Sequence, residues 1–327
     1  MRVLSGIQPS GQLHLGNYLG AMSQHIEMQE IHDCFFFIAN LHSLTTVQDA
    51  ALLEKYTRDV ALDYLALGLD PKKARIFRQS DVPEVTELAW ILSTVTGKGL
   101  LERATSYKDK VAKNIPASMG LFCYPLLMAA DILIYRSDLV PVGKDQVQHI
   151  EMTQDMATHF NETFGRQVLK RPEAKLNEAR IVPGVDGQKM SKSYGNAIDL
   201  FDTPQSTKKR VMSIKTDSTP VEAPKDPDSC SVFALYKLLA TPQETSALRA
   251  RYMEGGMGYG DAKKSLLEVI ERVLDPARQR RAQLETDADY VEDVLVTAGK
   301  GAREVARGVM EDVRSACGLT VAKGTHA

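Results

Sequence analysis

Two basic and two hydroxyl side chains alternate around a methionine in the stretch QKMSKSYG, residues 188–195. Lys189 and Lys192 carry positive charge, and Ser191 and Ser193 carry hydroxyl donors, which together suit the binding of a polyphosphate. An ordinary solvated surface loop has the same composition. The stretch by itself leaves both interpretations open.

A second candidate is the loop QPSGQLHLGN, residues 8–17, between a predicted strand and a predicted helix. Free N–H groups and the helix dipole attract phosphate at such a position. Gly11 and Gly16 permit close approach of the backbone, and His14 is a donor for charge developing on a phosphoryl group. On this loop alone, a plain turn with a surface histidine is favoured. A P-loop enzyme is disfavoured, because the sequence has no G-x-x-x-x-G-K-[ST].

The elements that must position these loops alternate between strand and helix. The apolar runs RVLS, CFFFIAN and ARIFRQS predict buried strands. Between the last two runs, apolar residues at helical spacing follow Asp49, a suitable N-cap, and end near Gly68. This alternation predicts a parallel α/β sheet, whose ligands bind at the carboxyl ends of the strands. Residues 104–171 and those from 202 onward are predicted to be mostly helical.

Composition narrows the class of protein. The 327 residues are 43% hydrophobic and 25% charged, with a net charge of −2, as expected of a soluble globule without a global basic field. Neither a signal peptide nor an apolar run long enough for a membrane span is recognisable. The four cysteines are widely spaced, which argues against a zinc site or a disulfide framework. We therefore expect a cytoplasmic protein that does not contact a membrane.

The two loops together resemble a known pair of motifs. HLGN at residues 14–17 and KMSKS at residues 189–193 are similar to the HIGH and KMSKS elements of class I aminoacyl-tRNA synthetases. KMSKS matches at all five positions, and HLGN is a variant of HIGH. The SGIQPSG lead-in and the run YPLLMAADILIY…LVPVGKDQVQHIE resemble the bacterial tryptophanyl-tRNA synthetases in particular. The resemblance covers nearly the whole chain and weakens in the last hundred residues.

The resemblance implies an enzyme that activates L-tryptophan with ATP and Mg²⁺, then transfers it from the adenylate to tRNA(Trp), releasing pyrophosphate and AMP. It implies no protein-held metal. The residues that match catalytic positions are His14, Lys110, Lys189 and Lys192. Those that match ATP-binding positions are Gln8, Pro9, Ser10, Gly16, Asn17, Gly143, Lys144, Asp145, Ile181 (or Val182), Lys189, Met190, Ser191, Lys192 and Ser193.

The amino-acid pocket follows from the same resemblance. Asp131 matches the carboxylate that accepts the indole N–H; on the residues alone it could equally be a helix carboxylate beside Arg136 or on a solvated face. Leu4 replaces the usual phenylalanine and Lys144 the usual glutamate, which are departures from the family pattern. The residues that match the other pocket positions are Leu4, His42, Tyr124, Met128, Val142 and Gln146.

The predicted architecture has three parts. A Rossmann-like parallel-sheet ATP-binding domain is expected over residues 1–103 and 172–200, interrupted by a helical segment, 104–171, that carries the pocket and a homodimer interface. Residues 201–327 are expected to form a helical domain that binds the tRNA anticodon. The alternatives are a tyrosyl-tRNA synthetase, a nucleotidylyltransferase, or a non-catalytic RNA-binding relative, for which His14, Lys189 and Lys192 would serve no purpose.

Overall fold

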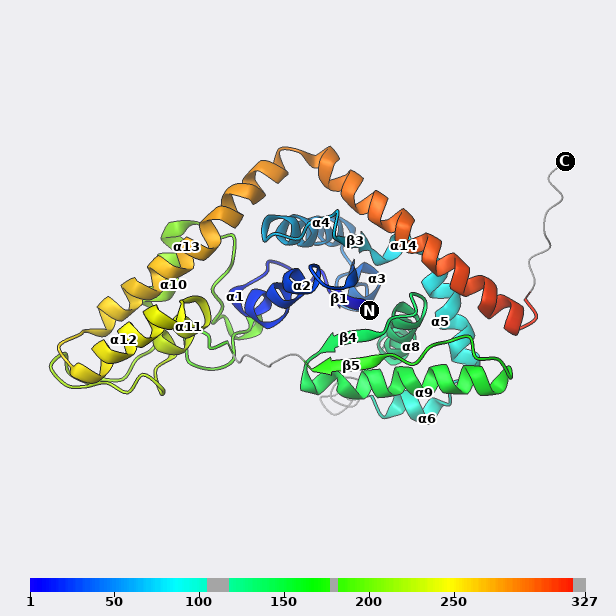
Figure 1. The fold of residues 1–327 in the computed structure, drawn as a ribbon, viewed down its shortest axis with the longest axis horizontal. Helices are drawn as coiled ribbons and strands as arrows, with labels where there is room; N and C mark the ends of the chain where they lie inside the picture. The colour runs from blue at the N-terminus through cyan, green and yellow to red at the C-terminus, as the bar shows by residue number, and fades with distance from the viewer. Residues whose placement is uncertain (105–117, 177–181, 320–327) are drawn as a thin grey trace.

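The computed structural model describes residues 1–104, 118–176 and 182–319 (Figure 1). Its centre is a five-stranded parallel sheet with the strand order β3-β2-β1-β4-β5. The strands are β1 (Arg2–Ile7), β2 (Asp33–Ile38), β3 (Ala74–Arg78), β4 (Leu139–Val142) and β5 (Glu173–Leu176). The chain winds outward from β1 in both directions, so a crevice opens at the carboxyl end of β1. The α/β fold predicted from the sequence is confirmed.

Helices connect the strands, as the sequence pattern predicted. Asp49 is the N-cap of α4, where its side chain accepts a hydrogen bond of 2.8 Å from the Leu52 N–H. The helical elements of the first part of the chain are α1 (Leu15–Asn17), the π-helix η1 (Tyr18–Met22), α2 (Ser23–Met28), α3 (Asn40–Ser43), α4 (Ala50–Ala66), η2 (Gln79–Asp81), α5 (Glu84–Val95), α6 (Lys98–Glu102), α8 (Met119–Leu133), η3 (Lys144–Gln146) and α9 (Val147–Thr163).

The remaining described chain is mostly non-helical up to residue 203 and again over residues 213–230, and is otherwise helical. Thr203 caps α10, and Pro204 occupies its first turn. Proline has no backbone N–H, and none is needed there because the first-turn N–H groups of a helix make no intrahelical hydrogen bond. The elements are η4 (Lys192–Tyr194), α10 (Pro204–Met212), α11 (Ser231–Leu239), α12 (Pro242–Glu254), α13 (Tyr259–Glu285) and α14 (Ala288–Ala316).

The sheet is covered on both faces, which explains why β2 is apolar at every position after Asp33. Phe36 points into a core shared with α4, α11 and α13, whereas Phe35 and Phe37 point into a second core shared with α5, α8 and α9. The two faces therefore have separate hydrophobic cores, and the strands can open a ligand site only at their ends.

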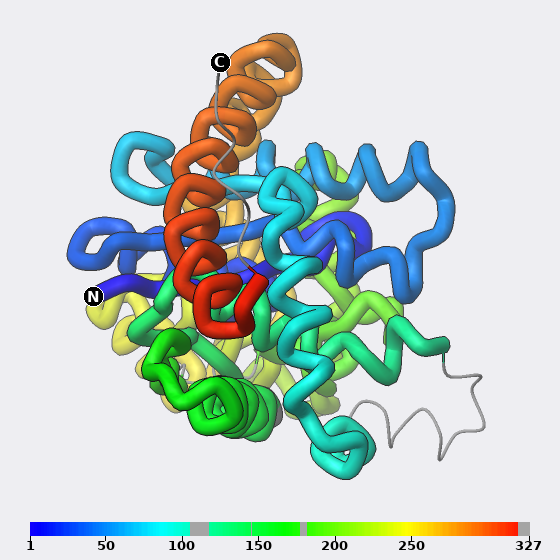
Figure 2. Tube along the Cα trace, turned by 90° about the vertical axis from the view of Figure 1, so that its right-hand side faces the viewer, coloured from blue at the N-terminus to red at the C-terminus, as the bar shows by residue number. Residues whose placement is uncertain are grey.

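The two last helices lie across the molecule as an inverted V, with α4 below its apex (Figure 1). α13 packs on α4 and α11, and α14 then returns along β3 and α5, where Val309 and Val313 join the second core. Figure 2 shows α14 and α5 running side by side. The boundary predicted at residue 201 stays a prediction; the structure adds that α14 packs on the sheet rather than beside α10–α12.

No helix within the described residues is long and apolar enough to cross a membrane.

Candidate active site

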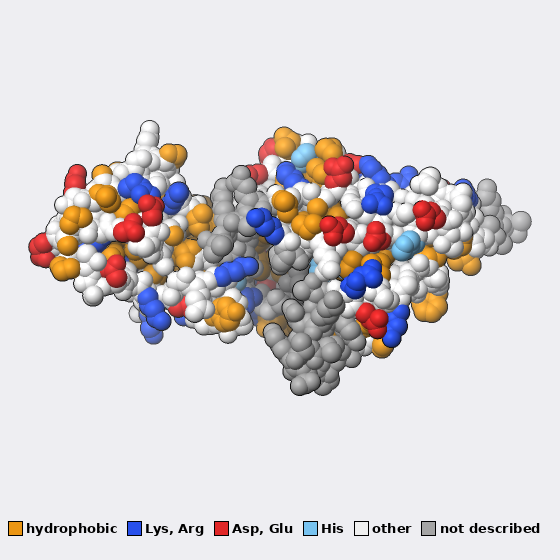
Figure 3. Space-filling model, turned by 90° about the horizontal axis from the view of Figure 1, so that it is seen from below, with side chains coloured by type: hydrophobic (Ala, Val, Ile, Leu, Met, Phe, Trp, Pro, Cys, Tyr) orange, Lys and Arg blue, Asp and Glu red, His pale blue; other side chains and the backbone are white. Residues whose placement is uncertain are grey.

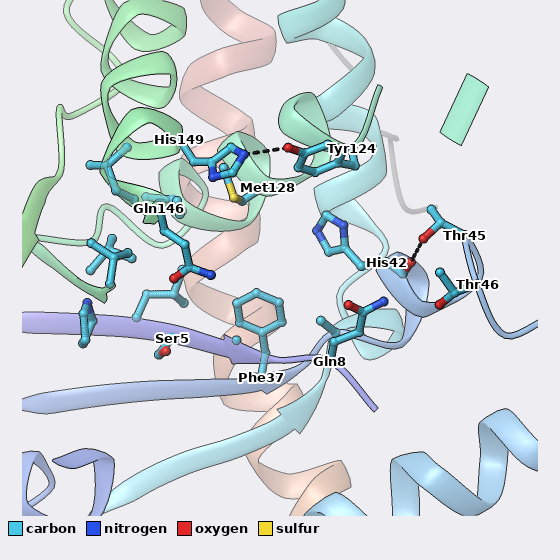
Figure 4. A pocket seen from close by; sticks show the side chains of 18 of the residues that line it. Ser5, Gln8, Phe37, His42, Thr45, Thr46, Tyr124, Met128, Gln146 and His149 are labelled. Atoms are coloured by element: carbon cyan, nitrogen blue, oxygen red, sulfur yellow. Dashed lines mark hydrogen bonds between the residues drawn. The ribbon is translucent and has the colours of Figure 1, made fainter. Parts of the chain in front are cut away.

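A cavity of about 390 Å³ opens at the carboxyl ends of β1, β2 and β4 (Figure 4). Strand residues form its floor, α8 and α9 supply one wall, and the segment around α3 supplies the rim. Six of the seven residues predicted for the amino-acid pocket line it: Leu4, His42, Tyr124, Met128, Val142 and Gln146. The structure therefore brings together side chains from four separate stretches of sequence around one mainly apolar space.

Gly6 on β1 has no side chain because the Phe37 ring occupies that space. A Cβ at this position would lie 2.5 Å from the ring carbon Cζ of Phe37. Leu4 and Gly6 alternate with the residues of the opposite core, so both face the cavity together with Phe37. The family pattern has a phenylalanine at position 4; this chain has Leu4 there, and Phe37 of β2 supplies an aromatic ring beside it.

Asp131, the seventh residue predicted for the pocket, lies one side chain behind the cavity wall. It is 1% exposed, and its Oδ2 accepts hydrogen bonds from His42 Nε2 at 3.1 Å and Gln79 Nε2 at 2.8 Å. Gln79 Nε2 also lies 3.0 Å from Oδ1. Arg136 is paired with Asp312 instead, so both structural alternatives for Asp131, a partner of Arg136 and a solvated carboxylate, are excluded.

Burial in this apolar helix raises the pKa of Asp131, while the hydrogen bonds from His42 and Gln79 oppose the rise. A carboxylate offers about four lone-pair positions, and the described residues fill three of them. One position on Oδ1 remains for a further donor. Such a buried, incompletely filled acceptor favours a ligand that brings an N–H group.

Three important residues of the site were not predicted from the sequence. His149 is hydrogen-bonded to the Tyr124 hydroxyl at 2.6 Å and lines the cavity, as does Phe37 (Figure 4). Gln79 orients Asp131. Gln79 directly follows β3, so the rule that ligands bind at carboxyl ends of parallel strands was the available signal. Nothing in the sequence marks His149, because only the packing of α8 against α9 brings it to Tyr124.

A second cavity, of about 490 Å³, lies where the first loop meets the lysine loop. Ser10 and Gly11 of the first loop line it together with Lys192, and the other lining residues are Gln12, Leu52, Lys55, Tyr56, Gly195, Ala197, Asp199 and Arg210. Three basic side chains and two hydroxyls, against the single carboxylate of Asp199, make this cavity suited to phosphate oxygens. Seen from below, several Lys and Arg side chains are exposed near the middle of the long axis of the molecule (Figure 3).

Backbone hydrogen bonds join the two loops. The Leu15 N–H donates to the Ile198 carbonyl at 2.8 Å, and the Leu200 N–H donates to the Leu13 carbonyl at 3.1 Å. His14 and Asp199 pair as an antiparallel bridge between these bonds. We call residues 13–15 and 198–200 the loop joint. It places His14 beside the lysine loop, although the two lie more than half the chain apart.

His14 is held in its neutral form. It is 8% exposed, and burial followed by the nearby positive charge of Lys192 lowers its pKa from 6.5 to about 4. Its Nδ1 has no hydrogen-bond partner among the described residues. A Cβ on Gly16 would lie 2.9 Å from that nitrogen, so glycine leaves room for the ring. Burial also lowers the pKa of Lys192.

Two of the other residues predicted to bind ATP line a cavity. Gln8 lines the first cavity and Ser10 the second. The side chains of Met190 and Pro9 are buried, whereas those of Lys189 and Ser193 are exposed outside the walls of both cavities. Lys110 and Ile181 lie outside the described residues, and so does the side chain of Asp145. The remaining predicted positions, which line neither cavity, are Gly16, Asn17, Gly143, Lys144 and Ser191.

Comparison with known proteins agrees with this geometry. A family model described as tRNA synthetases class I (W and Y) matches residues 1–275. A Rhodopirellula baltica protein named tryptophan–tRNA ligase is 53% identical over 320 residues, 98% of this chain and 100% of that protein. The chain belongs to this class I synthetase family.

Other bacterial proteins named for the same tryptophan enzyme are also similar to this chain. One from Fusobacterium nucleatum is 52% identical over 97% of this chain and 98% of its own length. The crystal structure of the Campylobacter jejuni tryptophanyl-tRNA synthetase, complexed with ADP and tryptophan, superimposes with a TM-score of 0.92. It is 46% identical, and the match covers 98% of this chain and 100% of that one.

We expect the imidazole of His14 to titrate near pH 4, and Lys192→Met to raise that pKa while burial keeps it below 6.5. ¹³C-edited NMR of histidine-labelled protein would measure both values, with Lys189→Met as a matched control that leaves the His14 pKa unchanged. A His14 pKa near 6.5, or one that Lys192→Met leaves unmoved, would contradict the described contact between the two loops.

Proposed function

We propose that this synthetase activates L-tryptophan with ATP and charges tRNA(Trp). The observation that carries the proposal is the pairing of an apolar cavity, backed by a buried carboxylate, with a basic cavity at the loop joint. The relatives named tryptophan–tRNA ligase span nearly the whole chain, which supports the same substrate. A tyrosyl-tRNA synthetase is the second candidate, because the family model covers both amino acids.

The first cavity is the proposed site for tryptophan. Met128 and Val142 flank the indole ring, and its N–H donates to the free position of Asp131. Phenylalanine has no such N–H, so it would leave the carboxylate position unfilled, and a buried polar group without a partner is costly. Tyr124 and Gln146 lie in the wall where they can hold the substrate ammonium group. His42 contributes by orienting Asp131.

The second cavity is the proposed site for the ATP phosphates. The tryptophan carboxylate attacks the α-phosphorus, the bond from that phosphorus to the bridging oxygen breaks, and pyrophosphate leaves. Lys192 lies where it can stabilise the charge that develops on the leaving pyrophosphate, and Ser10 can donate to a phosphate oxygen. Neutral His14 can donate a hydrogen bond without delivering a proton. Mg²⁺ enters as part of the Mg·ATP substrate, bound mainly by phosphate oxygens.

The remaining predicted ATP contacts complete this arrangement. Gly16 and Asn17 follow His14 and are proposed to face the adenosine, while residues 143–145 follow β4 and are proposed to hold the ribose. Lys189 is exposed on the same loop as Lys192 and reaches phosphate only if the loop closes. Gly187 and Gly195 have φ of 86° and 64°, a conformation that favours glycine, and they are the proposed hinges.

The tRNA is proposed to contact the helices that follow residue 201. Helices α10–α12 and the first part of α13 lie at the opposite end of the molecule from α9, which leaves their outer surface open to a large partner (Figure 1). We assign the anticodon arm to this region, the ATP-binding domain to residues 1–103 and 172–200, and the pocket-bearing segment to 104–171. Charging tRNA for protein synthesis places the proposed work of the enzyme in the cytoplasm.

We further propose a homodimer, with an interface that includes α5 and α8. Trp90 on α5 is 73% exposed and Met119 at the start of α8 is 71% exposed, and the two helices pack on each other. Exposed large apolar side chains on adjacent helices are typical of an interface. The second half of α8, from Ala129 to Leu133, is buried by its own chain, so the interface would be a patch rather than the whole helix.

Light scattering at micromolar concentration should give about twice the chain mass of 36.1 kDa, and Trp90→Asp should shift the mass toward that of one chain. Ile31→Asp is the matched control, because Ile31 is equally exposed, at 73%, on the loop after α2. Trp90 is the only tryptophan, so its emission should also move to shorter wavelength as the dimer forms. A mass near 36.1 kDa for the native protein rejects the dimer.

ATP–pyrophosphate exchange with each amino acid tests the proposed substrate. Only L-tryptophan should support rapid exchange, and Asp131→Asn should raise the KM for tryptophan at least about tenfold, since it removes a charge-assisted hydrogen bond. The KM for ATP should barely change. Asp312→Asn, which alters a carboxylate on the exposed α14 surface, is the control and should leave both constants unchanged.

Exchange stimulated by tyrosine would favour the second candidate, and the absence of exchange with any amino acid would reject both. An unchanged tryptophan KM in Asp131→Asn would remove this carboxylate from the pocket.

A further inference from the structure

Asn196 lies at the base of the lysine loop with its side chain fully enclosed. It is 1% exposed, although the neighbouring residues 192–195 are all exposed. A Cβ on Gly184 would overlap the Asn196 amide, so the glycine opposite gives this side chain its space. A buried amide must find hydrogen-bond partners, because leaving one unsatisfied costs about 1–3 kcal/mol.

The Asn196 amide finds those partners at three points of the loop. Its Nδ2 donates to Asp186 Oδ1 at 2.8 Å and to the Lys189 carbonyl at 3.2 Å. Its Oδ1 accepts from the Ser191 N–H at 2.8 Å. One side chain thus ties together the turn at Asp186 and the backbone on both sides of Met190.

The rest of the loop is arranged around this amide. The Gly184 N–H donates to the Gln188 carbonyl at 2.7 Å, and the Met190 N–H donates to the Val182 carbonyl at 2.8 Å, so these two arms form a tight antiparallel pair. The Val185 N–H donates to the backbone carbonyl of Asn196 at 3.0 Å. Lys192 directly follows the segment that the amide holds.

We propose that Asn196 is a positioning residue for adenylate formation, acting through Lys192. Two of its hydrogen bonds fix the course of the backbone from residue 189 to residue 191, and this course sets the direction in which Lys192 leaves the loop. The inference rests on the proposed role of Lys192 at the phosphates. The new element is that the loop moves as one unit, because the Asn196 amide hydrogen-bonds three of its residues and contacts neither substrate.

A purely structural role makes a different prediction from a positioning role. A buried asparagine that only stabilises the fold would affect every step of the reaction alike, through loss of folded protein. A residue that acts through Lys192 affects the step in which pyrophosphate leaves, and its effect disappears when Lys192 is already absent.

The experiment measures adenylate formation by single-turnover kinetics in Asn196→Ala, Lys192→Ala and the double variant. Lys192→Ala should slow this step by about 10²–10³-fold, the scale for one preorganised electrostatic contact. Asn196→Ala should slow it at least about tenfold with little change in the tryptophan KM, and should add less than about threefold in the Lys192→Ala background. Transfer from preformed adenylate to tRNA should stay near the wild-type rate.

Asn161→Ala provides the matched control. Asn161 on α9 is also buried, and its amide bonds three backbone groups, the Leu169 carbonyl and the N–H groups of Val168 and Leu169, and the Gln167 side chain. It should lower the Tm about as much as Asn196→Ala but leave adenylate formation unchanged. Asn196→Asp should be slow as well, because it places a second carboxylate against Asp186, and adding Asp186→Asn should restore part of the rate.

The outcomes separate the role of Lys192 from that of Asn196. If Lys192→Ala forms adenylate at the wild-type rate, the proposed role of the lysine is rejected, and the positioning role with it. If Lys192→Ala is slow but Asn196→Ala is not, only the role of Asn196 is rejected. The role of Asn196 is also rejected if its loss of rate persists in full without Lys192, or if transfer slows equally.

Discussion

The site depends on the loop joint, a pair of backbone hydrogen bonds between residues 13–15 and 198–200. Buried backbone N–H and C=O groups need hydrogen-bond partners, and here the backbone of each loop provides the partners for the backbone of the other. Leu15, Ile198 and Leu200 are buried in the core beside these bonds, which shields them from competing water. Arg278 of α13 adds a hydrogen bond of 2.9 Å to the Leu200 carbonyl, so the helical region also supports the joint.

The joint separates two kinds of chemistry within one crevice. On one side, the sheet and α8 form an apolar cavity backed by the buried carboxylate of Asp131, which can distinguish ring systems by their hydrogen-bond donors. On the other side, the two loops enclose basic groups that can stabilise charge on phosphate. In the proposed reaction, binding energy from the amino-acid side chain positions the carboxylate for attack, while the lysine loop is proposed to act on the leaving group.

The parts predicted from the sequence are those that depend on local patterns. The apolar run of β2 predicted a strand covered on both faces, and the cap at Asp49 marked the start of α4 correctly. Six pocket residues predicted from the family resemblance meet around one cavity. Residues such as His149, Gln79 and Asn196 could not be found this way, because their partners are set by tertiary packing between distant segments. The same is true of the return of α14 along β3.

The most direct test of the joint as the organising feature is a crystal structure with tryptophan, Mg²⁺ and a non-hydrolysable ATP analogue. The account predicts the indole ring between Met128 and Val142, with its N–H within hydrogen-bonding distance of Asp131. It also predicts that the terminal phosphates lie beside Ser10 and Lys192, with the hydrogen bonds of the joint intact. Phosphates bound away from the joint, or an indole N–H directed away from Asp131, would contradict it.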